Sequence, residues 1–235
     1  MNKDIVEKLL SLNKSFYAQF ADPFAHSRGN PQPGFFKLLE EMPPSFKYVV
    51  DVGCGNGRFG RFLRNHYSSF EYTGIDFSPE LLHKANESLI GTYYQRDISQ
   101  PGFLDGTGKF DVIVCLATMQ HIPGRVNRLR FLGELGSHLT HEGVMFLANW
   151  QFMDSVRQQR KIRDWELVNL SDADLELNDY LLSWQRDGYG LRYVCMIDAR
   201  ETAELAKEAG LVIKCQYRSD GKEGNLNLYT VLVQS

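Results

Sequence analysis

The sequence predicts an α/β fold built on an open, mostly parallel sheet, and two segments carry that prediction. Residues 48–52 form a short apolar run that ends at closely spaced glycines, and a helical pattern follows over 58–66. Residues 110–116 (FDVIVCL) form the clearest buried strand, and the turn at 117–123 falls at the carboxyl edge, where open α/β sheets bind ligands. A chain of 235 residues with 43% hydrophobic content is sufficient for one domain with a full core.

Three alternating glycines, Gly53, Gly55 and Gly57, follow the first predicted strand. Because they lack a Cβ atom, the backbone can turn tightly there and approach a ligand closely. The helix over 58–66 carries an apolar stripe, and its N-terminal amides and positive dipole end point back towards the loop. This segment therefore predicts a cradle for a nucleotide-like ligand.

The glycine pattern alone leaves two ligands open. Gly55, Gly57 and Gly60 also satisfy the G-x-G-x-x-G pattern of dinucleotide sites. Asp76 lies about 20 residues further on, where such sites have their ribose-binding acid. Asp51 decides between the two, because its charge is unfavourable beside a pyrophosphate but suits a cationic sulfonium amino acid. We therefore expect S-adenosylmethionine, a methyl donor, rather than NAD.

The next segments supply further contacts for this donor. Residues 71–76 predict a second strand whose terminal Asp76 accepts hydrogen bonds from both ribose hydroxyls. After a short third strand over 92–95, Asp97 is placed to accept from the adenine amino group and Ile98 to pack on the base. An ordinary loop acid at position 97 is an equal alternative. The other predicted donor contacts adjoin these motifs: Cys54, Phe77 and Leu116.

The remaining segments complete the pattern. A helix over 5–20 has apolar residues at helical spacing and precedes the first strand. A fifth strand covers 144–149, and the region 151–190 is an insertion rich in charged and aromatic residues, at an edge where insertions commonly select the substrate. The last predicted elements are a helix over 199–209 that ends at Gly210 and an antiparallel hairpin of 211–218 with 226–233.

Charge and cysteine content exclude several classes. A formal net charge of −3 weakens autonomous nucleic-acid binding, because phosphate contacts need clustered lysine and arginine. Basic clusters nevertheless occur on two predicted helices, one after each of the last two parallel strands. Solvated helix faces explain these clusters better than phosphate contacts do. The clusters are Arg125, Arg128 and Arg130 on the first helix and Arg157, Arg160, Lys161 and Arg163 on the second. The four cysteines form no C-x-x-C pair, which predicts reduced core thiols and no metal. Apolar runs are only strand-sized, so we expect a soluble cytoplasmic protein with no membrane segment.

Motif and order together resemble the class I S-adenosylmethionine-dependent methyltransferases: D-x-G-x-G-x-G, an acid ending strand two, an acid after strand three and a hydrophobic strand four. The resemblance implies a Rossmann-like seven-stranded sheet with an antiparallel last strand and helices on both faces. It implies one domain over 1–235, with an N-terminal helical cap at 1–45 and a substrate-side insertion at 151–190. In the cap, Tyr17 and Phe24 match positions that shield the donor, and Arg28 is the best candidate to bind its carboxylate with two parallel hydrogen bonds.

A narrower resemblance is to the methyltransferases that esterify a carboxymethyl group on the wobble uridine of tRNA. It rests on FYAQFADPFAHSR, DVGCGNG, ATMQHIPGRVNRLRFLGEL, LRYVCMIDARETAELAKEAG and NLYTVLVQ, in that order. It implies tRNA modification as the function and a small zinc-containing activator as a partner. The sequence departs from this family at Arg192-Tyr193-Val194-Cys195, where the family has R-Y-Y-H, and at Asn227-Leu228, where it has N-W.

The acceptor determines which residues are needed for chemistry. A carboxylate is ionised at neutral pH and needs no general base, so Arg192 would orient it while Tyr193 shapes the pocket. A hydroxyl or an amine would need a proton acceptor, for which His121 in the turn after the fourth strand is the natural candidate. A histidine in such a loop is slightly more often a packing or capping residue. The alternatives to a tRNA carboxylate are a small-molecule O- or N-methyltransferase and a non-catalytic scaffold that binds the donor.

Overall fold

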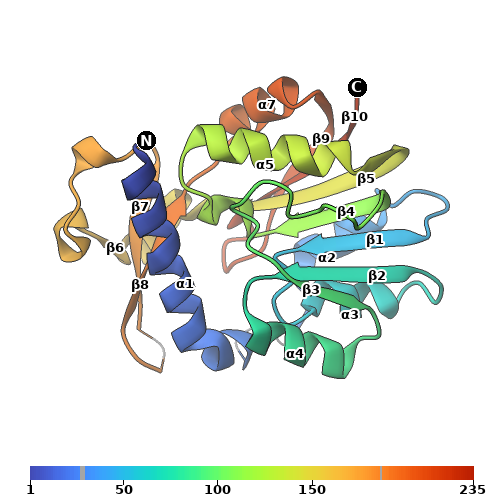
Figure 1. Cartoon of the computed structure of the whole chain (residues 1–235), viewed down its shortest axis with the longest axis horizontal. Coiled ribbons are helices and arrows are strands. Elements are labelled where there is room, and N and C mark those ends of the chain that lie inside the picture. Colours follow the sequence, from blue (N-terminus) through green and yellow to red (C-terminus); the bar gives the residue numbers. More distant parts are fainter. Residues whose placement is uncertain (27–29, 186) are drawn as a thin grey trace.

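The structure is a computed structural model that describes residues 1–26, 30–185 and 187–235, without the side chains of residues 24–26. Its helices and strands follow one another along the chain (Figure 1): α1 Lys3–His26, α2 Pro33–Leu39, β1 Tyr48–Val52, α3 Arg58–Arg64, β2 Glu71–Asp76, α4 Pro79–Ser88, β3 Thr92–Gln95, β4 Phe110–Leu116, α5 Arg125–Ser137, β5 Leu139–Trp150, α6 Val156–Gln159, β6 Ile162–Arg163, β7 Asp179–Trp184, β8 Gly190–Cys195, α7 Ala199–Glu208, β9 Leu211–Ser219 and β10 Asn227–Gln234. Short 3-10 turns lie at Met119–His121, Phe152–Asp154, Trp165–Val168 and Asp172–Asp174.

The large sheet has seven strands in the order β3-β2-β1-β4-β5-β10-β9. The strands from β3 to β5 are parallel, and β10 runs antiparallel to both β5 and β9. The predicted seven-stranded sheet with a reversed last strand is therefore confirmed. The strand order reverses between β1 and β4, and ligands of open α/β sheets bind outside the carboxyl ends of the strands at such a point.

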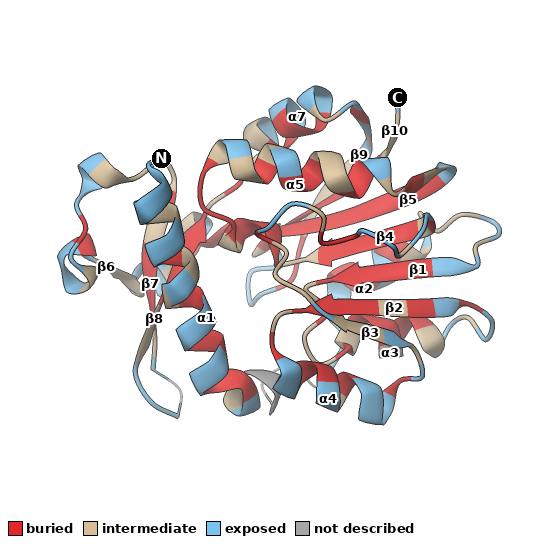
Figure 2. Cartoon of the chain, in the orientation of Figure 1, coloured by how far each residue is buried: buried red, intermediate tan, exposed pale blue. Residues whose placement is uncertain are grey.

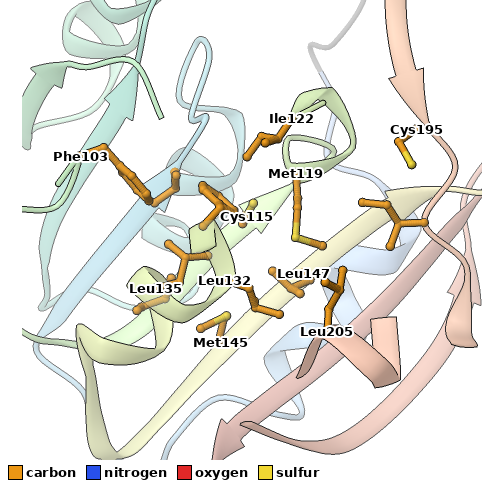
Figure 3. Close-up of a cluster of buried hydrophobic side chains, with 14 of the residues drawn as sticks. Phe103, Cys115, Met119, Ile122, Leu132, Leu135, Met145, Leu147, Cys195 and Leu205 are labelled. Atoms are coloured by element: carbon orange, nitrogen blue, oxygen red, sulfur yellow. The ribbon is translucent and has the colours of Figure 1, made fainter. Parts of the chain in front are cut away.

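Two apolar layers cover the faces of this sheet. On one face, α5 and α7 pack their leucines against the strands, and Figure 3 shows Leu132, Leu135 and Leu205 meeting Met145 and Leu147. On the other face α2 and α3 bury a cluster of aromatic rings that includes Phe35 and Phe62. The sheet is therefore buried between two apolar layers.

A second sheet with the order β6-β7-β8 lies beside the first, and α1 lies between the two (Figure 1). One face of α1 is buried and the other is exposed (Figure 2), as the apolar spacing predicts. The helix has a break at Phe20 (φ −114°, ψ 20°), because Pro23 lacks an amide proton and its ring would clash with the carbonyl one turn earlier. The predicted end at residue 20 coincides with this break, but the helix continues to His26.

The region 151–190 is more regular than its sequence suggests. It contributes β6 and β7 to the second sheet, which β8 completes. The basic helix predicted after the fifth strand is only the four residues Val156–Gln159, so Arg160, Lys161 and Arg163 lie outside it. These strands could not be predicted from hydrophobic periodicity, because β6 has only two residues and β7 mixes buried and half-buried residues without alternation.

Two further features concern the predicted absences. Among the helices of the described residues, none is long and apolar enough to cross a bilayer. The same residues contain no group of three or more His, Cys, Asp or Glu side chains arranged to hold a metal ion.

Candidate functional site

A cavity opens at the carboxyl ends of β1, β2 and β4, where the strand order reverses, and α1 closes one side of it. It contains most of the predicted donor contacts: Tyr17, Asp51, Gly53, Cys54, Gly55, Asp76, Phe77, Asp97, Ile98 and Leu116. Gly57 does not line the cavity, and Arg28 lies outside the described residues. The structure thus brings together residues that are spread over a hundred positions of the sequence.

The glycine loop needs glycine for two different reasons. Gly53 and Gly55 both have left-handed backbone conformations, with φ of 74° and 53°. A Cβ at Gly53 would also lie only 2.3 Å from the hydroxyl oxygen of Thr118. At Gly55 a Cβ would meet nothing within 4 Å, because that position faces open space in the cavity. The loop therefore presents bare backbone to a ligand, as its sequence predicts.

Asp76 is fixed in orientation by two backbone amides. Its Oδ2 accepts from the amide of Gly55 and its Oδ1 from the amide of Ser78, each at 2.9 Å. Since each carboxylate oxygen has two lone pairs, one on each oxygen remains for the two hydroxyls of a ribose. Burial raises the pKa of this carboxyl. The geometry fits the predicted bidentate acceptor.

Asp51 lies deeper, with 3% of its surface exposed. The Tyr72 hydroxyl donates to its Oδ2 at 3.0 Å, and burial is the main cause that raises its pKa to about 7. A cation entering the cavity would favour the ionised form of this acid. Asp51 therefore suits a ligand with positive charge and is poorly placed for one with a pyrophosphate.

Asp97 also lines the cavity. Its Oδ2 accepts from Lys14 at 2.7 Å, and its Oδ1 accepts from the hydroxyl and the amide of Ser99. Burial alone would raise the pKa of this carboxyl, but the bonds from Lys14 and Ser99 outweigh it and the pKa lies below its ordinary value. The acid is thus ionised, and Ile98 lies beside it on the cavity wall.

Sequence reasoning missed Arg58 and Phe35, which form another wall of the cavity. The Arg58 guanidinium lies 5.2 Å from the centre of the Phe35 ring and donates to Gln32 at 2.9 Å. Burial lowers the pKa of Arg58. The position of Arg58 directly after the glycine loop could have identified it as a cavity residue. Phe35 lies on a helix that carries no recognisable motif, so the sequence offered no such signal for it.

His121 lies at the rim of the cavity with both ring nitrogens engaged. The backbone carbonyl of Tyr193 lies 3.1 Å from Nδ1, and because a carbonyl can only accept, the proton of the neutral ring is on Nδ1. Nε2 then accepts from the hydroxyl of Tyr17 at 2.9 Å. This tautomer follows from the hydrogen-bond pattern.

Arg192 lies on β8 and is 4% exposed. Its guanidinium carbon lies 4.5, 5.1 and 5.8 Å from the ring centres of Trp150, Phe16 and Trp184, a group that we call the arginine box. Burial lowers the pKa of this guanidinium, and the Tyr17 hydroxyl acts in the opposite direction. Among the residues that the structure describes, Nε and Nη1 have no partner and no carboxylate pairs with the guanidinium.

The structure places the Tyr193 side chain elsewhere than predicted. Successive residues of a strand point to opposite faces, so Tyr193 turns away from the arginine box and its hydroxyl donates to Asp179 at 2.7 Å within the core. Only its backbone reaches the site, through the bond to His121 and two bonds to Asn13. The expectation that Tyr193 shapes the pocket is therefore not supported by its position.

Comparison with known proteins gives one family over most of the chain. The family described as a methyltransferase domain matches residues 26–216. A trans-aconitate 2-methyltransferase of Streptomyces avermitilis is 30% identical over 129 residues, which cover 51% of this chain and 44% of that protein. The mouse tRNA (carboxymethyluridine(34)-5-O)-methyltransferase is 25% identical over 163 residues, or 69% of this chain and 23% of that protein. The chain thus spans less than half the length of either relative.

Solved structures agree with the fold. A S-adenosylmethionine-dependent methyltransferase from Clostridium acetobutylicum superposes with a TM-score of 0.67 at 17% identity, covering 94% of this chain and 99% of that one. At this identity the likeness supports the architecture of the sheet and its helices, which is the framework on which the cavity is built.

Proposed function

The chain belongs to the methyltransferase domain family, and we propose that it transfers a methyl group from S-adenosylmethionine to a carboxylate oxygen of its acceptor. The observation that carries this proposal is Arg192, a buried guanidinium with unpartnered N–H groups beside a cavity that fits the donor. A buried cation without an acid is costly unless a ligand supplies the negative charge.

The donor is held by the residues of the cavity. Asp76 accepts from the ribose hydroxyls, Asp97 and Ile98 hold the adenine, and Asp51 faces the cationic amino-acid end. When bound, S-adenosylmethionine supplies a methyl carbon on a positively charged sulfur, and the electron pair of the breaking C–S bond stays on that sulfur as the carboxylate oxygen forms its bond. Tyr17 and Phe77 contribute aromatic surface that excludes water from this end of the cavity.

Arg192 orients the acceptor. A guanidinium binds a carboxylate through charge-assisted N–H bonds, and Nε and Nη1 of Arg192 have no hydrogen-bond partner among the described residues. The acceptor oxygen is already ionised at neutral pH, so the step needs alignment rather than a base. His121 is then a positioning group for Tyr17, since its Nε2 already accepts from that hydroxyl.

We propose a carboxymethyl group on a tRNA wobble uridine as the acceptor, following the sequence resemblance. The printed name of the mouse relative names that group, and the half-buried Lys161 near Arg192 adds positive charge beside the arginine box. A small acid is the second candidate, because the relative from Streptomyces avermitilis is named for trans-aconitate. A small zinc-containing activator, a cytoplasmic location and a substrate-side role for the insertion at 151–190 belong to the same proposal.

Two measurements test the proposal in turn. Calorimetry should show binding of S-adenosylmethionine and S-adenosylhomocysteine but not NAD, and binding of NAD alone would contradict the donor. With the methyl-labelled donor, the protein should then transfer label to tRNA that carries carboxymethyluridine or to trans-aconitate. The same tRNA with an unmodified uridine is the matched control. Transfer to hydroxyl or amine acceptors only would overturn the carboxylate.

A further inference from the structure

Two residues with a permanent positive charge line the donor cavity in the described part of the chain, Lys14 and Arg58. Lys14 pairs with Asp97 at 2.7 Å, so its charge is already balanced by an acid of the fold. Arg58 forms no ion pair with an acid of the described residues, and its Nη2 donates to the neutral side-chain oxygen of Gln32 at 2.9 Å. The charge of Arg58 is therefore left for a ligand of the cavity to balance.

Arg58 and Asp51 lie on either side of the glycine loop. Asp51 belongs to β1, which leads into the loop, and Arg58 is the first residue of α3, which follows it. Both residues line the cavity, and between them the loop presents bare backbone at Gly55. The amino-acid part of S-adenosylmethionine carries an ammonium and a carboxylate on one carbon atom. An acid before the loop and an arginine after it match these two opposite charges.

We infer that Arg58 binds the α-carboxylate of the donor, so that the cavity selects S-adenosylmethionine over relatives that lack this carboxylate. The inference rests on the proposed function for its donor and adds a residue that determines donor specificity. The sequence assigned the carboxylate to Arg28, which lies outside the described residues. Asp51 then binds the ammonium, in keeping with the proposed place of the cationic amino-acid end beside it.

The guanidinium of Arg58 is held in place before a ligand arrives. It lies 5.2 Å from the ring centre of Phe35, which also lines the cavity, and the bond to Gln32 takes one of its five N–H donors. Burial lowers the pKa of Arg58, because the charged form loses water there, and an anion bound beside it compensates for that loss. A carboxylate binds such a group through charge-assisted N–H bonds, which are roughly twice as strong as neutral ones.

The test is calorimetric binding of two ligands to the full chain: S-adenosylhomocysteine and its decarboxylated analogue, in which a hydrogen replaces the α-carboxylate. We expect the unaltered chain to bind S-adenosylhomocysteine at least about tenfold more tightly, because the analogue loses the hydrogen bonds to a charged group. In Arg58→Met the two affinities should lie within about twofold of each other, through weaker binding of S-adenosylhomocysteine alone. Arg58→Lys should restore part of the difference, since it keeps the charge.

Arg64→Met is the matched control. Arg64 belongs to the same helix and also lies over an aromatic ring, 3.8 Å from the centre of Phe70, but it does not line the cavity. Its side chain donates to the carbonyls of Ser68 and Phe70, at 3.2 and 3.1 Å. The difference in affinity between the two ligands should therefore persist in this variant.

An equal loss of affinity for both ligands in Arg58→Met would overturn the inference, because Arg58 would then only support the structure of the loop. A difference that persists undiminished in this variant would also overturn it, as would equal affinities or no binding in the unaltered chain. If Arg58→Met does not fold, Arg58→Gln removes the same charge and the same comparison applies. The measurement involves no turnover, so its failure is distinguishable from failure of the proposed function, which fails if the unaltered chain methylates no carboxylate.

Discussion

Two arginines of the described residues are almost fully buried, and they differ in their partners. Arg128, 2% exposed, binds Glu201 through Nε at 3.1 Å and Glu176 through Nη2 at 3.2 Å, and Nη1 donates to the Ile122 carbonyl. Arg192, 4% exposed, has aromatic rings around it and no acid, and burial lowers its pKa. The first charge is neutralised by acids of the fold, whereas no acid of the described residues pairs with the second.

This difference separates structural from functional charge in the molecule. Arg128 joins α5 to α7 and to Glu176 of the insertion, so its contacts hold the second sheet and the large sheet together. Removing one partner of such a buried pair leaves the other charge without compensation. Arg192 contributes no ion pair among the described residues, which is why we propose that it serves to bind the acceptor.

The largest expected effect is on stability at Arg128. We expect Arg128→Met to lower the free energy of unfolding by about 3 kcal/mol, because the half-buried Glu176 and Glu201 lose the buried cation that pairs with both. Urea unfolding followed by circular dichroism measures this change. A loss below about 1 kcal/mol would remove the distinction between the two arginines.

The matched substitution Arg192→Met should lower activity and leave stability largely unchanged. We expect methyl transfer to fall about 100-fold, while the free energy of unfolding stays within about 1 kcal/mol or rises, because an unpaired buried cation is removed. Donor affinity should be unchanged, since Arg192 does not line the cavity. If stability falls as far as in Arg128→Met while turnover per folded molecule is preserved, Arg192 is structural.

In its partners, Asp51 is intermediate between the paired Arg128 and the unpaired Arg192: it is a buried acid with one hydrogen-bond donor and a pKa of about 7. Because burial raises this pKa from 3.8 to about 7 in the folded chain, the stability of the free protein falls as the pH rises between these two values, and a bound cation offsets that loss by favouring the ionised form. Donor affinity should therefore fall about tenfold between pH 8 and pH 6, with nearly one proton released on binding at pH 6 and almost none at pH 8. Calorimetry in buffers of different ionisation enthalpy measures both quantities. Asp51→Asn should flatten the profile, and a profile that keeps its slope in this variant would assign it to another group.

The smallest effect is expected at Tyr193, the neighbour of Arg192 in sequence. Tyr193→Phe removes a hydroxyl that donates to Asp179, so we expect a loss of about 1 kcal/mol in stability. Turnover should not change, since the backbone carbonyl that binds His121 is retained. Thermal unfolding and the methyl-transfer assay on one preparation measure both. A large loss of turnover would instead support the prediction that Tyr193 shapes the acceptor pocket.

The segments that line the cavity could be predicted from the sequence because their signals are local. Strand, glycines and acid follow one another within 48–76, and the first four parallel strands have the bounds that their apolar runs predict. The fifth strand begins five residues earlier than predicted, at Leu139, because its polar start lies outside the apolar run. Hydrophobic periodicity is strongest for such buried strands.

The arginine box could not be predicted in the same way. Its members come from α1, β5, β7 and β8, and no spacing in the sequence relates Phe16 to Trp150 or Trp184. The error at Tyr193 has a simple cause: adjacent residues were assigned to one pocket, although alternation along a strand turns them to opposite faces. The basic residues near Arg128 show the same limit, because the sequence does not reveal the acids that neutralise them.

The central claim is that the methyl group is transferred to a carboxylate held by Arg192, and the chemical stability of the product tests it most directly. The protein would be incubated with methyl-labelled donor and tRNA that carries carboxymethyluridine, and in parallel with trans-aconitate, and each product would be treated with mild alkali. We predict that the label is released as volatile methanol, as expected of a methyl ester, and that Arg192→Met forms little labelled product. Label that resists alkali, or that forms equally well in Arg192→Met, would contradict the account.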